Sequence, residues 1–486
     1  MIDNDIAWQA LTSRDVRFDG LFFVGVTSTG IYCRPVCPVK PPRRENCLFF
    51  ASAEAAEKAA FRPCLRCRPE LAPGNAPVDN AHRIIDLLLA RIDEGMIDEA
   101  SSLEEVAAWF HLSLRQLRRI VQQQLGVSPL ELKQTRRLLL AKQLLTETRL
   151  PVTDIAFASG FNSLRRFNDV FNARYRMPPS RLRKEAAAGE HHSQQADSST
   201  LLLSYRPPYN WQAMLDFLRL RALKNVEWVD ETRYVRTVQL GRYRGWICVS
   251  HMAAKHALQV RFSHSLTGAL PALLRRLRNL FDLNAHPHCI DALLRQDPLL
   301  TASIDNDPGL RVPGAFDGFE MTVRAVLGQQ ITVKAATTLG GRFANAFGEA
   351  FDTPFPELTR LAPQPQRIIE ATLDEIAGLG IVSARARSIQ ALAAACASGE
   401  LQLDSCSHPE EMMQRMKQLP GIGDWTAAYI AMRALRWPDA FPAGDIVIRN
   451  NLGKISAKQA EARSKIWQPW RSYAVMHIWK NLTPKK

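Results

Sequence analysis

The sequence lacks the features that would carry a chain into or across a membrane. Its first residues, MIDNDIAWQA, contain neither a basic head nor an apolar run, so no signal peptide is expected. No stretch of about 18 uninterrupted apolar residues occurs, so we expect no membrane span. Nine cysteines without an export signal indicate a reducing, cytoplasmic compartment, in which paired cysteines bind metal more often than they form disulfides.

Positive charge is in excess. The formal net charge is +14 over 486 residues, and 46% of the residues are hydrophobic. A chain of this length exceeds a single hydrophobic core, so roughly three or four domains are expected. The excess charge lies mostly beyond residue 80 and points to a polyanionic partner. A basic enzyme with no such partner would have the same composition.

Two polar segments divide the chain. PELAPGNAPVDN (69–80) is rich in Pro, Gly and Asn, and AAAGEHHSQQADSST (186–200) is typical of a flexible linker. A further boundary is expected near DPGLRVPGAFDGF (307–319). The predicted domains and linker are 1–75, 80–185, 186–200, 201–315 and 316–486.

The predicted domain 80–185 contains an internal repeat. Ser113 and Pro129 in the first copy correspond to Ser163 and Pro179 in the second, and each copy predicts a helix, a short turn and a second helix. That layout is typical of a helix-turn-helix. A single copy is equally compatible with a basic helix that faces solvent and binds nothing. Two copies in tandem favour a DNA-binding function. The arginines expected to face DNA bases and phosphates are Arg115, Arg118, Arg119, Arg165 and Arg166.

One stretch of this repeat carries a family resemblance. DIAFASGFNSLRRFNDVFNARYRMPPSRLR resembles the AraC-type transcription regulators in its Ile-Ala pair, Gly-Phe, Ser, spaced Phe, Pro and Arg. The resemblance implies two helix-turn-helices that read successive major grooves of promoter DNA. We also expect the chain to be a monomer and to contact RNA polymerase.

Four cysteines form two pairs near the amino terminus. The spacing is Cys-x3-Cys followed by Cys-x2-Cys, which suits a tetrahedral four-thiolate zinc site, formed by Cys33, Cys37, Cys64 and Cys67. Closed sites of this kind are usually structural, so the spacing alone predicts a zinc ion that only stabilises the domain.

The residues around these cysteines indicate that the zinc site has a chemical role as well as a structural one. STGIYCRPVC, RENCLFF and FRPCLRCRPE together resemble the amino-terminal domain of the Ada family of alkylation-response proteins, which implies that Cys33 accepts a methyl group from a DNA methylphosphotriester. Zinc keeps the sulfur deprotonated and nucleophilic at neutral pH. Methylation removes one negative charge from the site, so DNA should then bind more tightly. Phosphate contacts are predicted for Arg34, Arg44 and Arg62.

A second motif lies near the carboxy terminus. QLPGIGDWTAAYIAMRAL (418–435) predicts a helix-hairpin-helix in which Gly421 and Gly423 let backbone amides approach a DNA phosphate. Asp445 follows in FPAGDIVIRNNL, an arrangement that resembles the base-excision DNA glycosylases. A carboxylate there would stabilise positive charge on the sugar or prepare a water, whereas a helix N-cap is the alternative interpretation. Trp425 occupies the position of the lysine of bifunctional members, so a monofunctional enzyme is expected.

A wider resemblance covers residues 201–482. LSYRPPYNWQAMLDFLRLRAL, YRGW, LFDL, VRAVLGQQITV and IWQPWRSYAVMHIW are similar to the AlkA-type 3-methyladenine DNA glycosylases. The resemblance implies that Asp445 is catalytic, and that a flipped, cationic alkylated purine stacks on aromatic rings. The family's DNA-wedging leucine falls at Gln330. The implied base pocket is Trp425, Tyr429 and Trp479, and the hairpin carbonyls of a monovalent-cation site are those of Leu419 and Ile422.

These patterns predict a multidomain, mainly α protein. We expect a small α/β zinc domain, an all-α double helix-turn-helix, an α+β lobe and an all-α helix-hairpin-helix core. Two functions remain open: a repair enzyme and regulator in one nucleoid-associated bacterial chain, or a methylation-sensing transcription factor whose glycosylase fold only grips DNA. The Pro-Cys-His-Arg motif of O6-methylguanine repair is absent.

Overall fold

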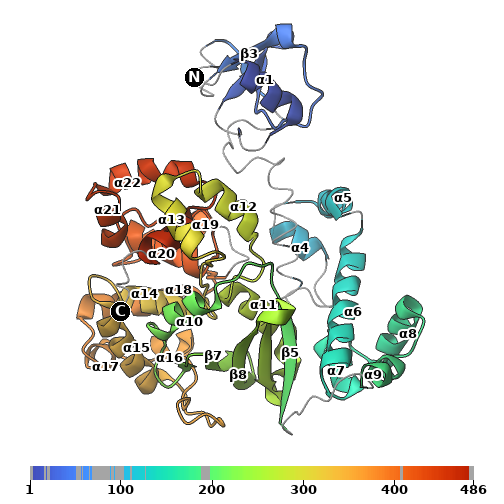
Figure 1. Cartoon of the computed structure of the whole chain (residues 1–486), viewed down its shortest axis with the longest axis vertical. Helices are drawn as coiled ribbons and strands as arrows, with labels where there is room; N and C mark the ends of the chain where they lie inside the picture. Colours follow the sequence, from blue (N-terminus) through green and yellow to red (C-terminus); the bar gives the residue numbers. More distant parts are fainter. Residues whose placement is uncertain are drawn as a thin grey trace. The chain divides into compact units, whose positions relative to one another are not determined.

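The computed structural model describes residues 4–15, 18, 22–50, 56, 59–64, 66–67, 88, 92, 103–109, 112–125, 127–187, 197–404 and 409–480. The predicted segment 69–80 and most of the predicted linker 186–200 lie outside these ranges. The chain forms two compact units, residues 1–89 with 99–132 and residues 90–98 with 133–486 (Figure 1). In the described residues, no helix combines the length and apolarity needed to cross a bilayer.

The first unit contains a small sheet. Its strands are β1 (Phe23–Val26), β2 (Ile31–Cys33), β3 (Cys47–Phe50) and β4 (Arg62–Pro63), in the order β3-β1-β2-β4. Helix α1 (Asn4–Ser13) packs Ala7, Ala10 and Leu11 against Phe22 and Val24. Strands β2 and β4 are parallel, and the Cys64 N–H donates to the Tyr32 carbonyl at 3.0 Å. This pairing brings Cys33, the last residue of β2, close to Cys64, which follows β4.

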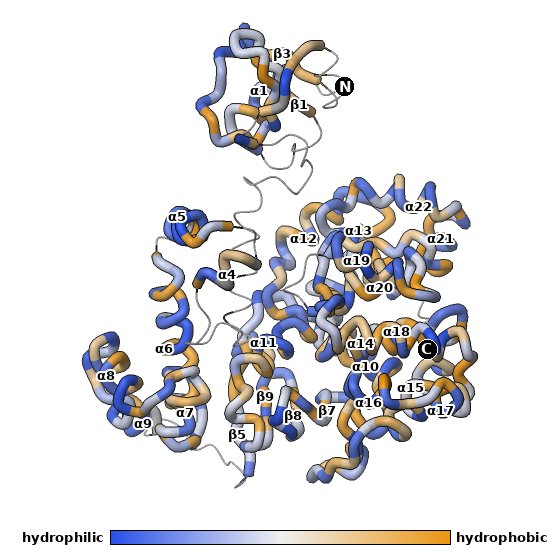
Figure 2. Tube along the Cα trace, turned by 180° about the vertical axis from the view of Figure 1, so that it is seen from behind, coloured by the Kyte–Doolittle hydropathy of each residue, from blue (hydrophilic) through white to orange (hydrophobic). Residues whose placement is uncertain are grey.

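The repeated motif folds as predicted into helices with matching ends. The first copy contains α4 (Leu103–Trp109) and α5 (Leu114–Leu125), and α6 (Pro129–Glu147) continues into the second unit. The second copy contains α7 (Val152–Ala158), α8 (Leu164–Tyr175) and α9 (Pro179–Ala187). Ser113 and Ser163 each accept a backbone N–H of the following helix at 3.2 Å, so both act as N-caps. Figure 2 shows α5 as largely hydrophilic.

The second unit contains a five-stranded antiparallel sheet in the order β5-β9-β8-β7-β6. Helices α10 (Trp211–Arg219) and α11 (Leu270–Leu280) pack apolar faces against it, and Figure 1 shows α11 beside the sheet. Side chains of α6 close the edge strand: Gln143 donates to the Leu202 carbonyl and Glu147 accepts the Leu202 N–H, each at 2.8 Å. The strands are β5 (Ser198–Ser204), β6 (Glu227–Val229), β7 (Arg233–Leu240), β8 (Tyr243–Met252) and β9 (Ala257–Ser263).

The remainder of the second unit is helical. Helix α14 (Gly318–Leu327) is buried along most of its length within a large apolar cluster. The other helices are α12 (Pro287–Leu294), α13 (Pro298–Asn306), α15 (Val333–Phe347), α16 (Pro365–Ile369), α17 (Leu373–Ala377), α18 (Ser383–Ala397), α19 (Pro409–Lys417), α20 (Asp424–Arg433), α21 (Ile446–Asn451), α22 (Ala457–Ser464) and α23 (Arg471–Lys480). The predicted fold class is therefore confirmed.

A buried ionic network joins the sheet to the helical core. Arg236 of β7 donates to Glu320 of α14 at 2.7 Å, and Arg324 of α14 donates to Glu227 of β6 at 2.9 Å. Tyr234 also donates to Glu227, at 2.5 Å. Buried charges are tolerated only when they are paired and hydrogen-bonded in this way. The network fixes α14, and with it the loop that follows, relative to the sheet.

Candidate functional site

The four predicted zinc ligands lie together. The sulfurs of Cys33, Cys37, Cys64 and Cys67 are all within 4.8 Å of one another. Four convergent thiols without any other ligand suit a tetrahedral zinc site. Cys33 is half-buried while the other three are buried, so Cys33 presents its sulfur most openly to a partner.

The cluster needs a cation to ionise fully. Hydrogen bonds with Cys37 and Cys67, followed by burial, raise the pKa of the Cys33 thiol. Hydrogen bonds with Cys33 and Cys67 lower the pKa of Cys37 to about 3, because they stabilise its thiolate. Four thiolates so close together repel one another, and a divalent cation removes that cost.

The arginines predicted near this cluster differ in exposure. Arg44 and Arg62 are exposed, and Arg44 pairs with Asp5. Arg34 is completely buried, and its backbone N–H approaches the Cys67 sulfur at 3.5 Å. A phosphate contact by Arg34 would therefore require its side chain to move, and this contact stays a prediction.

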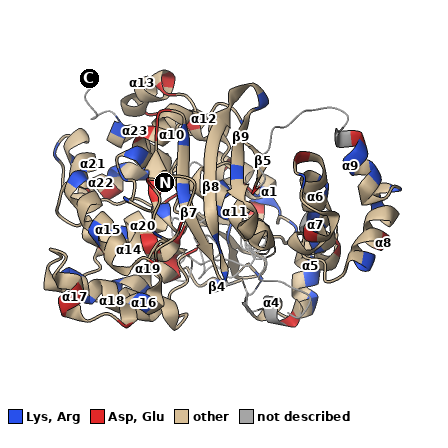
Figure 3. Cartoon of the chain, turned by 90° about the horizontal axis from the view of Figure 1, so that it is seen from below, with Lys and Arg blue, Asp and Glu red and all other residues tan. Residues whose placement is uncertain are grey.

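The helix-turn-helix arginines are exposed, as a DNA contact requires. Each helix buries its apolar side, including Leu117 of α5 and Phe167 of α8, and turns its basic side to solvent. Figure 3 shows basic residues along α8 and α9. The exposed arginines are Arg115, Arg118, Arg119, Arg165 and Arg166.

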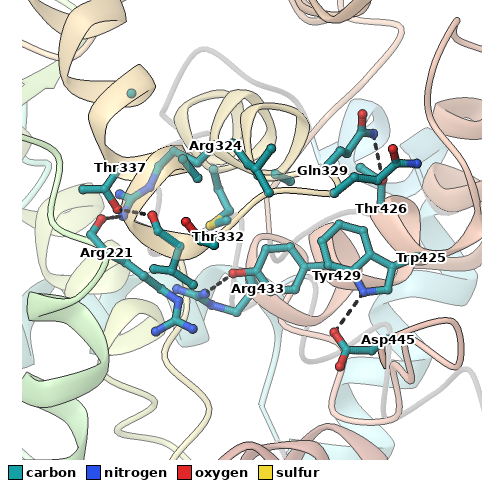
Figure 4. Close-up of a pocket in the computed structure, with 18 of the residues that line it drawn as sticks. Arg221, Arg324, Gln329, Thr332, Thr337, Trp425, Thr426, Tyr429, Arg433 and Asp445 are labelled. Carbon is teal, nitrogen blue, oxygen red and sulfur yellow. Dashed lines mark hydrogen bonds between the residues drawn. The ribbon is translucent and has the colours of Figure 1, made fainter. Parts of the chain in front are cut away.

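A cavity of about 1120 Å³ lies in the second unit. It is bordered by the loop between α14 and α15, by α20, and by the start of α21 (Figure 4). The structure brings nearly all the predicted glycosylase residues to this one cavity. Among those that line it are Asp445, Trp425, Tyr429, Trp479, Gln330, Gly421 and Gly423.

Asp445 is both a helix N-cap and a pocket residue. One carboxylate oxygen accepts the N–H groups of Val447 and Ile448, at 2.9 and 3.0 Å, at the start of α21. The same oxygen accepts the indole N–H of Trp479 at 3.3 Å, and the other accepts that of Trp425 at 3.1 Å. The helix cap is therefore confirmed, four donors hold the carboxylate at the cavity, and its catalytic role stays a prediction.

Aromatic rings form the wall beside this carboxylate. The rings of Trp425 and Tyr429 are stacked, with centroids 5.4 Å apart and planes 3° apart. Trp479 lies 6.1 Å from Tyr429 at 55°. These residues are one turn apart on α20 and on the distant α23, so the wall depends on the tertiary fold.

The hairpin between α19 and α20 has the predicted form. Gly421 has a φ of +77°, and a Cβ there would lie 2.3 Å from the Ser388 hydroxyl oxygen, so glycine is required on both grounds. Gly423 caps α20 and has open space around its Cα. The Ile422 N–H donates to the Leu419 carbonyl at 3.3 Å, and the cation site predicted at these carbonyls stays a prediction.

Family models match nearly the whole chain in four segments. They are the metal binding domain of Ada (residues 6–70), a helix-turn-helix domain (106–185), the AlkA N-terminal domain (200–317) and the HhH-GPD superfamily base excision DNA repair protein (323–472). A relative from Mycobacterium tuberculosis (strain CDC 1551 / Oshkosh), "Probable bifunctional transcriptional activator/DNA repair enzyme AlkA", is 36% identical over 485 residues, 99% of this chain and 97% of the relative. The chain belongs to this family of bifunctional activator and DNA repair proteins.

Two further similarities concern the second half of the chain. "DNA-3-methyladenine glycosylase 2" of Escherichia coli (strain K12) is 36% identical over 277 residues, 57% of this chain and 95% of the relative. The structure of a 3-methyladenine DNA glycosylase from Archaeoglobus fulgidus aligns with a TM-score of 0.52 at 18% identity, over 57% of this chain and 97% of that one. The second match shows a shared fold.

Several pocket residues of this family member were not predicted from the sequence. Gln329 donates to the Gly421 carbonyl at 2.8 Å and to the Thr426 hydroxyl at 2.9 Å, which ties the α14–α15 loop to the hairpin. Its neighbour Gln330, at the predicted wedge position, is exposed and has a φ of +56°. The inner end of the cavity also holds unpredicted arginines, namely Arg221, Arg324 and Arg433.

Proposed function

We propose that this chain is a DNA alkylation repair protein and a transcriptional regulator. Its glycosylase unit removes alkylated purines of the 3-methyladenine type, and Cys33 accepts a methyl group from DNA methylphosphotriesters. The observation that supports the first activity is the Asp445 carboxylate, held by two indoles at the edge of an aromatic cavity next to a DNA-binding hairpin. The glycosylase named in Escherichia coli supports the same activity.

The geometry suits monofunctional cleavage. A purine flipped from the duplex stacks on Trp425 and Tyr429, with its sugar beside Asp445. The bond between C1′ and the base breaks, and its electron pair leaves with the base, which neutralises an alkylated, cationic purine. The carboxylate stabilises the positive charge that develops on the sugar, and water then adds to C1′ and loses a proton, which leaves a hydroxyl on the sugar. No amine occupies the Trp425 position, so we expect no covalent imine with the sugar and no strand cleavage.

Methyl transfer uses the most open sulfur of the cysteine cluster. The Cys33 sulfur forms a bond to the methyl carbon while the bond from that carbon to the phosphate oxygen breaks, and the phosphodiester leaves as an anion. Bound zinc would keep the sulfurs as thiolates. The thioether product has no easy leaving path, so each chain reacts once. Loss of one negative charge then favours DNA, which is how we propose that damage switches promoter binding.

The rest of the proposal concerns partners. The exposed arginines of α5 and α8 contact promoter DNA, the regulator acts as a monomer together with RNA polymerase, and the protein works at the bacterial nucleoid in the cytoplasm. The hairpin carbonyls of Leu419 and Ile422 hold a monovalent cation.

A second candidate function is a transcription factor whose glycosylase fold only binds DNA, since hairpins of this kind are also used for binding alone.

Base release from methylated duplex DNA separates the two candidates. The wild-type chain should release alkylated purines with turnover, and Asp445→Asn should release them at least about a hundredfold more slowly, because the charge that stabilises the sugar is gone. Equal release by both proteins would remove Asp445 from the mechanism. If the wild-type chain releases no base but still binds the DNA, the result would support the second candidate, in which the glycosylase fold only binds DNA.

A further inference from the structure

An exposed apolar side chain lies at the rim of the cavity, directly after Asp445. Ile446 begins α21 and lines the cavity, yet it is 61% exposed to solvent. A side chain that both lines a cavity and faces solvent lies at the opening. Ile448, farther along the same helix, is completely buried in the apolar core. The core therefore holds α21 through Ile448, while Ile446 stays in water.

The stability of the fold does not account for an isoleucine at this position. A side chain that stays in water gains little burial energy, and the branched isoleucine forms helices less well than alanine or leucine. Single exposed apolar residues are ordinary on protein surfaces, so exposure alone indicates nothing. The position of Ile446 is informative because it shares the rim with groups that we propose to meet DNA.

The rest of the rim suits a nucleic acid strand. Gly421 and Gly423 of the hairpin line the cavity and are exposed. Gln330 is exposed on the loop between α14 and α15, and Gln329 ties that loop to the hairpin by donating to the Gly421 carbonyl at 2.8 Å. Of the described residues that line the cavity, only Val333 and Ile446 are large, apolar and exposed, and Val333 is less exposed, at 43%.

The position of Asp445 sets what Ile446 can touch. In the proposed reaction, the sugar of the flipped nucleotide lies beside the Asp445 carboxylate and its base lies inside the cavity. Ile446 is the next residue in the chain and lies at the opening, so it meets what lies just outside that sugar. In a duplex this is the adjoining nucleotide, whose base loses a stacking partner when the damaged base leaves the helix.

From this arrangement we infer that Ile446 packs against the nucleotide next to the lesion and stabilises the duplex with the damaged base flipped out. Other DNA-binding proteins insert apolar side chains between base steps to stabilise unstacked DNA. Gln330, at the wedge position implied by the resemblance, offers an amide, and Ile446 adds apolar surface from a different segment. Ile446 is a positioning residue, since it contacts DNA away from the reacting atoms. The inference rests on the proposed glycosylase function and adds to it a contact with the undamaged neighbour.

The test measures release of 3-methyladenine from duplex and from single-stranded DNA by the full-length chain. Only in the duplex must a base leave a paired stack. With protein in excess and spontaneous loss subtracted, the ratio of the duplex rate to the single-strand rate should fall about fivefold in Ile446→Ala, because less apolar surface covers the unstacked base. Ile446→Leu keeps that surface and should have a ratio close to that of wild type. An equal fall of both rates in Ile446→Ala would overturn the inference, because the side chain would then act through the fold.

Ile466→Ala is the matched control. Ile466 is also an isoleucine of the second unit, 56% exposed, but it lies outside the residues that line the cavity. Its ratio should equal that of wild type. A wild-type ratio in Ile446→Ala overturns the inference and leaves the proposed function intact. If wild type releases no base from single strands, the duplex rates decide, and equal rates for Ile446→Ala and Ile446→Leu overturn the inference. Release of no base from the duplex by wild type contradicts the proposed function itself.

Discussion

At the scale of single residues, Asp445 has a structural role, and we propose that it also has a chemical one. One oxygen caps α21 and the other faces Trp425, so the cap orients the carboxylate for the cavity. The sequence allowed a cap or a catalytic group. The structure shows the cap and places the carboxylate against two indoles of the cavity, and the catalytic role stays a proposal.

Stability separates the two roles of Asp445. Asparagine caps helices about as well as aspartate, so Asp445→Asn should leave the free energy of unfolding nearly unchanged although base release is lost. Asp445→Ala removes the cap and should cost about 1 kcal/mol. Denaturant unfolding of the three proteins measures this. A large loss of stability in the asparagine variant would mean that its inactivity reflects misfolding.

The reactivity of Cys33 should depend on the metal. Removal of zinc by a chelator should abolish methyl uptake, because the pKa of the Cys33 thiol is raised in the cluster without a metal and the neutral thiol is a poor nucleophile. Intact-protein mass after incubation with methylated duplex reports the gain of one methyl group. Cys33→Ser should lose the gain, while Cys289→Ser, at an exposed cysteine outside the cluster, should retain it. A gain that persists in Cys33→Ser would place the acceptor elsewhere.

At the scale of helices and strands, the residues at helix ends and turns could be read from the local sequence. Long-range packing could not be predicted in this way. Ser113, Ser163 and Gly421 act through neighbours in the chain, so their caps and turn could be read from the sequence. The burial of Arg34 could not, because it depends on packing with residues far along the chain. The placement of Arg221 in the cavity was missed for the same reason.

The hairpin offers a paired test of backbone geometry. Gly421→Ala should destabilise the second unit by at least about 1 kcal/mol, since its φ is +77° and a Cβ would clash with Ser388. Gly444→Ala is the control, because its φ is not positive and an added Cβ would lie 3.6 Å from the nearest side-chain atom, an ordinary contact. Unfolding free energies of both variants check this. Equal values would show that the Gly421 turn relaxes without cost.

The buried network predicts a loss of stability in acid. Burial alone would raise the pKa of Glu227, but Arg324 and Arg236 outweigh it and lower the pKa to about 2 from an ordinary value of 4.5. A depressed folded-state pKa contributes stability that is present above about pH 4.5 and is lost as the pH falls toward about 2. Unfolding free energy measured across this window should decline, and less steeply in Glu227→Gln. Identical slopes would remove Glu227 as a cause.

At the scale of the whole molecule, the chain combines four family segments, and three of them present features that suit DNA. The net charge of +14 agrees with a polyanionic partner. The proposed chemistry occurs at two places, the cysteine cluster of the first unit and the cavity of the second. In each, an anionic protein group reacts with or stabilises an electron-poor carbon of damaged DNA.

One incubation tests this account most directly. The full-length, zinc-loaded chain is mixed with excess methylated duplex DNA, and both the mass of the protein and the bases released from the DNA are measured. We predict that each chain gains a single methyl group at Cys33 while it releases many alkylated purines. An unchanged protein mass together with an intact set of bases, in a chain that still binds the DNA, would contradict the account.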